Sequence, residues 1–124
     1  MKNFFKLLIL TFLLHNCSTN RSSQSVSFNQ DKLIGHWVHS HEDDYDDIKV
    51  YRLSSYQFPP SRGREKIVFK SNAVLEYTPI APNDLPQTFN GEWKIDKSDL
   101  ILEYDDNKKI YEIIEVTSSI LKLK

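Results

Sequence analysis

The sequence predicts an all-β protein: a small antiparallel barrel of eight strands that follows an N-terminal signal segment. Beyond residue 30, apolar and polar side chains alternate with a period near two, and turn-forming residues recur about every eight to twelve positions. Aromatic side chains make up 12% of the chain, and they suit the half-buried surface of a sheet. Past residue 30, no stretch of helical length carries an apolar stripe at helical spacing. A closed barrel suits a domain of this size because closure removes unpaired sheet edges.

The first segment, residues 1–16, has the pattern of an export signal. Lys2 and Lys6 precede an apolar run from Leu7 to Leu14, and a short polar step follows. As a helix this run would span about 12 Å at roughly 1.5 Å per residue. The hydrocarbon core of a bilayer is about 30 Å thick. The pattern therefore predicts a signal peptide in place of a permanent transmembrane helix.

The end of this segment, Leu14-His15-Asn16-Cys17, resembles a bacterial lipobox. Leu14 matches the preferred residue three positions before the cysteine, whereas Asn16 stands where a small residue is usual. The resemblance implies cleavage before Cys17 and lipidation of that cysteine with a diacylglyceryl group and an acyl chain such as palmitate. Two or three acyl chains on one residue give stable membrane anchoring. The alternative is an ordinary secretory signal with a chance cysteine.

Residues 17–30 are expected to form the lipidated cysteine and a flexible tether, because Ser, Asn and Gln dominate them. The barrel domain is then expected at residues 31–124. Lipidation at Cys17 places the protein in the cell envelope. Ser18 follows the cysteine in place of Asp, and in a Gram-negative cell the lipoprotein sorting rule then implies the outer membrane, facing the periplasm.

Eight strands are expected in the barrel domain, and residues 31–33 should form a short turn or 3₁₀ entry before the first. Breakers such as Pro59-Pro60 and Asp105-Asp106-Asn107 separate the strands. The last strand alternates up to Lys124, so we expect it to pair with the first strand and close the barrel. The expected strands are 34–41, 47–54, 65–70, 73–79, 88–95, 99–104, 108–116 and 119–124.

Both tryptophans of the chain belong to a repeated Gly-x-Trp unit, Gly35-His36-Trp37 and Gly91-Glu92-Trp93. A glycine lets the backbone bend or approach a neighbour closely. The tryptophan two residues later faces the same side of the strand and can fill the interior. Trp37 is accordingly either a ligand contact or part of the packed core.

The ordered series of Gly-x-Trp units and apolar strands resembles the small lipocalin-like domains of bacterial lipoproteins. The series runs through Ile67-Val68-Phe69, Leu100-Ile101-Leu102 and Leu121-Lys122-Leu123, so the resemblance covers nearly all of residues 31–124. The chain is shorter than typical lipocalins, which leaves less room inside. The resemblance implies a barrel that binds a small apolar or amphipathic molecule.

The most distinctive stretch, residues 50–65, resembles a segment shared by a group of small uncharacterised bacterial proteins. Tyr51 and Tyr56 lead into a stiff proline pair, and Arg62 and Arg64 flank the glycine at position 63. Two guanidinium groups so placed could clamp a carboxylate or phosphate by bidentate hydrogen bonds. Alternatively, the arginines pair with acids of the protein itself. Arg62, Arg64, Tyr51, Tyr56 and Trp37 are therefore the predicted ligand contacts.

A second stretch, residues 36–47, combines histidines with carboxylates. His39 and His41 lie two apart, on the same strand face as Trp37. Imidazoles and carboxylates together are weak candidates for a divalent metal site, although the acidic run lacks EF-hand spacing. The alternative, a solvated acidic hairpin loop, leads us to predict no metal.

Composition and motifs do not point to catalysis or nucleic acid. Removing Lys2 and Lys6 from the 16 basic residues leaves 14 against 17 acidic ones, whereas nucleic-acid binding needs a basic surface. The single cysteine excludes an intramolecular disulfide. The chain has no nucleophile elbow, phosphate-binding loop, dinucleotide fingerprint or His-Glu-x-x-His. We expect no enzyme activity and no cofactor.

Two functions remain open from the sequence. The first is a membrane-anchored binding protein for a small apolar or amphipathic molecule, held in the barrel interior or its open mouth, with Arg62 and Arg64 near an anionic group of that molecule. The second is an interaction module of the envelope, an inhibitor or assembly factor, with a filled core. Its partner protein would bind the loops 55–65 and 79–88, because loops on a rigid scaffold commonly carry function.

Overall fold

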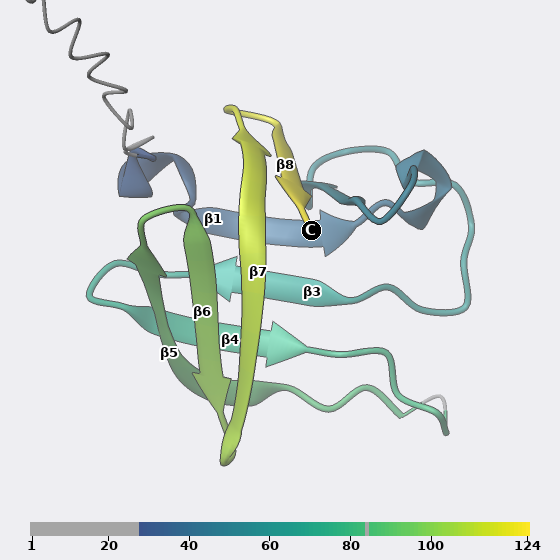
Figure 1. Ribbon diagram of the computed structural model, residues 1–124. Coiled ribbons are helices and arrows are strands. Elements are labelled where there is room, and N and C mark those ends of the chain that lie inside the picture. The colour runs from purple at the N-terminus through teal and green to yellow at the C-terminus, as the bar shows by residue number, and fades with distance from the viewer. Residues whose placement is uncertain (1–27, 84) are drawn as a thin grey trace, which may run out of the picture.

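The computed structural model describes residues 28–83 and 85–124 (Figure 1). The predicted signal peptide, the predicted lipidation at Cys17 and most of the predicted tether lie outside these residues. Two 3₁₀ turns and eight strands follow one another along the chain. They are η1 (Gln30–Lys32), β1 (Gly35–His39), η2 (His41–Asp43), β2 (Lys49–Leu53), β3 (Lys66–Phe69), β4 (Val74–Thr78), β5 (Phe89–Asp96), β6 (Asp99–Tyr104), β7 (Asn107–Val116) and β8 (Ile120–Leu123).

The strands form a closed antiparallel barrel, which confirms the predicted fold class. Their order around the barrel is β1-β2-β8-β7-β6-β5-β4-β3, and β3 returns to β1. The expectation that the last strand pairs with the first is wrong. β1 has β2 on one edge and β3 on the other, so β8 pairs with β2 and β7 instead.

This order depends on the segment between β2 and β3, residues 54–65, which we call the crossover. β2 and β3 both run antiparallel to β1, so they run in the same direction as each other. The crossover must therefore carry the chain back along the length of β1, from the end of β2 to the start of β3. Val38, which points away from the barrel interior, is only 6% exposed. The outer face of β1 is accordingly covered at this position.

One buried cluster of side chains fills the barrel, and its largest members are aromatic. Trp37 is 1% exposed and Trp93 is 5% exposed. The indole N–H of Trp37 donates to the Leu33 carbonyl (2.8 Å), and that of Trp93 donates to the Lys70 carbonyl (3.0 Å). Each tryptophan thus satisfies its only polar atom within the chain. The partly buried Phe28 also packs against this cluster, upstream of the predicted start of the barrel at residue 31.

The two glycines of the Gly-x-Trp units have different physical roles. Gly35 has φ +151°, a conformation that L-residues rarely adopt. Gly91 is needed for space instead: a Cβ there would lie 2.0 Å from the Glu103 carbonyl oxygen on the neighbouring strand β6. Glycine is therefore required at position 35 by the backbone conformation and at position 91 by the lack of space for a side chain.

Within the described residues, no helix is both long enough and apolar enough to span a bilayer.

Candidate functional site

The candidate site lies where the crossover meets the segment between β4 and β5, residues 79–88, which we call the 79–88 loop. Lys66 at the start of β3 pairs with Thr78 at the end of β4. The crossover and the 79–88 loop therefore share one end of the barrel, and Figure 1 shows the crossover entering β3 and the 79–88 loop leaving β4 on the same side. The two segments are separated in the sequence by β3 and β4, and the pairing of these strands brings them together.

A hollow of about 360 Å³ opens between these two segments, and we call it the loop hollow. One part of its lining is cationic, from Arg62, Arg64 and Lys66. Another part is apolar, from Pro79, Ile80, Ala81 and Pro86. The lining therefore combines the two properties that an amphipathic anion requires.

The three cations of the loop hollow are not equivalent. Arg62 and Lys66 are exposed, and neither forms an ion pair with any residue in the described parts of the chain. The Arg64 side chain is only 9% exposed and pairs with Glu42. Among the described residues, Arg62 and Lys66 thus have no carboxylate partner, whereas Arg64 is engaged by Glu42.

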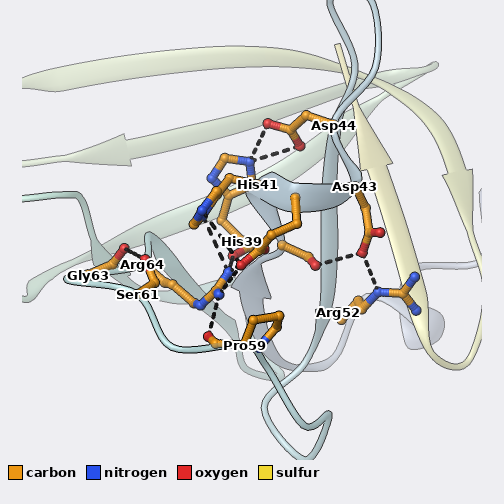
Figure 2. A network of polar contacts seen from close by, with 11 residues as sticks. His39, His41, Asp43, Asp44, Arg52, Pro59, Ser61, Gly63 and Arg64 are labelled. Carbon is orange, nitrogen blue, oxygen red and sulfur yellow. Dashed lines mark hydrogen bonds and ion pairs between the residues drawn. The ribbon is translucent and has the colours of Figure 1, made fainter.

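Arg64 joins the crossover to η2 and β1 (Figure 2). Its guanidinium donates to both carboxylate oxygens of Glu42, to the His39 carbonyl (3.0 Å) and to the Pro59 carbonyl (2.8 Å). The same group lies over the Phe58 ring, 4.8 Å from its centroid. The hydrogen bond from Arg64 lowers the pKa of Glu42 to about 2. Arg64 therefore fixes one wall of the loop hollow.

A second arginine, Arg52 on β2, contacts the first part of the crossover at Tyr56. Its Nε donates to Asp43 (2.9 Å), and its guanidinium lies 4.5 Å from the centroid of the Tyr56 ring. Hydrogen bonds from the Ser40 hydroxyl and from Arg52 lower the pKa of Asp43. Tyr56 remains 43% exposed and lies outside the lining of the loop hollow.

The histidines of residues 36–47 take part in the same local structure. The buried His39 donates from Nε2 to the Asp44 carboxylate (2.9 Å), which also accepts from the Val50 N–H (2.8 Å). His41 is exposed, and its Nε2 lies 3.6 Å from Glu42. Across the residues that the structure describes, no group of three or more His, Cys, Asp and Glu side chains could hold a metal ion.

Comparison of the sequence with models of protein families identifies the family of this chain. The model of the lipocalin-like domain matches residues 33–123.

The chain belongs to the lipocalin-like domain family.

No curated protein and no solved structure matches the chain. The matched range begins at Leu33, the residue that accepts the Trp37 indole bond, and ends in β8, so it contains every strand of the barrel. Lipocalin-like domains are typically binding proteins, and the family thus indicates a barrel that binds small molecules.

The interior of this lipocalin-like barrel has a polar end that sequence reasoning missed. Glu65 is 5% exposed and accepts a hydrogen bond from the Tyr51 hydroxyl (2.8 Å). Lys49 Nζ lies 3.5 Å from the other oxygen of Glu65. Lys109 Nζ donates to the Tyr77 hydroxyl (2.7 Å). Burial raises the pKa of Tyr51 and of Tyr77 well above the usual value for a phenol.

The alternation of the strands could have identified these polar residues. Glu65 precedes Ile67 and Phe69 by even steps, and Lys109 precedes Tyr111 and Ile113 in the same way. Even spacing puts each of them on the inward face. Among the predicted ligand contacts, Tyr51 and Trp37 therefore lie in the filled interior, while Arg62 and Arg64 line the loop hollow.

Proposed function

We propose that this lipocalin-like protein binds a small amphipathic molecule in the loop hollow, with the acidic group of that molecule facing Arg62 and Lys66. The observation that carries the proposal is the lining of the hollow, which places these two cations beside the apolar side chains of Pro79 and Ile80. The volume of about 360 Å³ lies at the lower end of the range of roughly 300–1,000 Å³ for ligand sites.

Two further properties support a ligand at this place. The core cluster occupies the barrel interior, so the loop hollow offers the more accessible site. Arg64 pins the crossover to η2, so one wall of the hollow is formed before a ligand arrives. A preorganised site loses less conformational entropy when a ligand binds. We therefore favour a binding role over an enzymatic one.

We propose in addition that acylation of Cys17 anchors the protein to a membrane of the cell envelope. In a Gram-negative cell the expected position is the outer membrane, facing the periplasm. The support is the lipobox-like Leu14-His15-Asn16-Cys17 and the acylation that it implies. Cys17→Ala should move the protein from the membrane fraction to the soluble fraction. A variant that stays in the membrane fraction like the wild type would show that another feature is the anchor.

Calorimetric titration of decanoate into a Cys17→Ser chain tests the ligand site. Decanoate carries one carboxylate and a short apolar chain, whereas decanol lacks the charge. We expect decanoate to bind more tightly than decanol, and Arg62→Ala to weaken decanoate binding roughly tenfold or more, because hydrogen bonds to charged groups are the stronger ones. Lys108→Ala is the matched control, since Lys108 is an exposed cation outside this hollow. Equal effects of the two substitutions would refute the site.

The filled interior favours a second candidate, an envelope interaction module that acts as an inhibitor or assembly factor. Its partner would bind the crossover and the 79–88 loop. Native mass spectrometry separates the two candidates. A small molecule that copurifies with the chain supports the binding protein, and a bare chain that forms a stoichiometric complex with one envelope protein supports the interaction module.

A further inference from the structure

We propose that Ile80 and Leu85 of the 79–88 loop, together with Arg62 and Lys66, dock this end of the barrel on an anionic lipid surface. Docking through this surface does not require a soluble ligand in the loop hollow. Docking does not require acylation of Cys17 either, because the docking residues belong to the barrel domain.

The apolar part of this surface is unusually exposed. Leu85 is 69% exposed and Ile80 is 60% exposed, the two highest values among the large apolar side chains in the described ranges. Both lie in one loop, whereas single apolar side chains scattered over a surface are ordinary. Pro79, Pro82 and Pro86 punctuate this loop. Proline fixes φ and has no backbone donor, so the loop presents its apolar side chains on a restrained backbone with fewer N–H groups to desolvate.

The charge beside these side chains favours a lipid headgroup over an uncharged partner. Arg62 and Lys66 line the same hollow as Ile80 and are exposed without an ion pair inside the described parts of the chain. The loop itself contains one acid, Asp84. Exposed apolar side chains bordered by Arg and Lys are the composition that binds the interface of anionic bilayers.

Another exposed apolar residue on the same strand pair provides the contrast. Val74 is 42% exposed and lies at the opposite end of β4 from the 79–88 loop. It pairs with Glu92 across the β4–β5 ladder, and Glu76 follows two positions later on the same face. Glu76 is paired with Lys70 (2.7 Å), and Glu92 has no cationic partner among the described residues. These residues offer no free cation to an anionic surface, so Val74 is a matched control position.

An environment-sensitive fluorophore attached at Leu85 tests the proposal directly. Cys17→Ser is introduced into the full-length chain so that the label attaches only to Leu85→Cys or, in the control, to Val74→Cys. Each protein is added to vesicles of phosphatidylcholine alone or mixed with phosphatidylglycerol. Residues 1–16 are the same in both proteins, so any adsorption through them affects both equally.

We expect the label at Leu85 to shift to shorter emission wavelength on the phosphatidylglycerol vesicles only, and the label at Val74 to stay unchanged. Arg62→Glu in the Leu85-labelled protein should reduce the apparent partition coefficient about fivefold or more, because one basic residue near an anionic surface contributes about that factor. An unshifted Leu85 label, equal shifts at both positions, or equal shifts on both vesicle types would overturn the proposal.

Two outcomes separate this proposal from its alternatives. Leu85 does not line the loop hollow, so Leu85→Ser should reduce vesicle docking and leave decanoate titration unchanged. A chain that binds decanoate but gives no vesicle signal at Leu85 overturns the docking surface and leaves the proposed ligand site standing. A Leu85 label that responds to a lipid-free envelope protein and not to vesicles overturns docking in favour of a protein partner.

Discussion

The three glycines of the chain should respond very differently to alanine, and Gly91 gives the strongest test of the barrel packing. A Cβ at Gly91 would lie 2.0 Å from the Glu103 carbonyl oxygen, 2.9 Å from the Tyr104 Cβ and 3.0 Å from the Glu103 carbonyl carbon. Two of these atoms are backbone, so no rotation of a side chain can relieve the clash. β5 and β6 must separate locally instead.

The cost can be worked from this geometry. Overpacking in a well-packed interior costs about 1–3 kcal/mol, and opening about two ladder hydrogen bonds as β5 and β6 separate costs about 2 kcal/mol more, at about 1 kcal/mol each. We therefore expect Gly91→Ala to lower the free energy of unfolding by about 3–5 kcal/mol. Gly35→Ala should cost about 1–3 kcal/mol from its φ of +151°. Gly63→Ala should change stability by less than about 0.5 kcal/mol, because nothing lies within 4 Å of its Cβ position.

Urea unfolding of the three variants, followed by tryptophan fluorescence and circular dichroism, measures this series. Small domains are stable by only about 5–15 kcal/mol, so a Gly91→Ala protein without a folded baseline would also agree with the expected direction. If Gly91→Ala unfolded at the same urea concentration as Gly63→Ala, β5 and β6 could not approach as closely as the structure shows.

Three more predictions follow from the core and the ion pairs. Trp37→Ala should lower the free energy of unfolding in urea by about 3–5 kcal/mol. Trp37→Phe should lower it less, because only the hydrogen bond to the Leu33 carbonyl and part of the ring are lost. Equal stability of the wild type and both variants would place Trp37 outside the core. The pKa of Glu42 falls from 4.5 to about 2 on folding, so its stabilisation is complete above pH 4.5 and is lost as the pH falls toward 2. The gap in urea midpoint between wild type and Glu42→Gln should therefore close over that interval, and a constant gap would contradict the pairing with Arg64. Burial raises the pKa of Tyr51, Tyr77 and Tyr111 above 10. Above pH 10 the unfolded chain therefore releases protons that the folded chain keeps, and the free energy of unfolding should fall. In an absorbance titration these phenols should ionise only as the barrel unfolds.

The loop hollow shows how a correct choice of residues can still miss their roles. The sequence marks Arg62 and Arg64 as a pair because both flank Gly63. In the barrel, Arg64 reaches Glu42 and the His39 carbonyl, which are 22 and 25 positions away in the chain. Lys66, in place of Arg64, is the second exposed cation that lines the loop hollow. Which arginine finds an internal acid depends on how the crossover returns to β1, and local spacing does not contain that information.

The alternation of side chains by itself determined the eight strands, which end within two residues of their expected bounds, and the inward position of Trp37 and Trp93. This worked because a strand sends successive side chains to opposite faces, so burial on one face leaves a period of two in the sequence. The order of the strands was decided only by the tertiary structure. Ladder hydrogen bonds join backbone groups that every residue other than proline carries, so β8 could have paired with β1 or β2 on the same alternation. The crossover places β3 on the second edge of β1, and the pairing of β3 with β4 brings Arg62 and Lys66 beside Ile80.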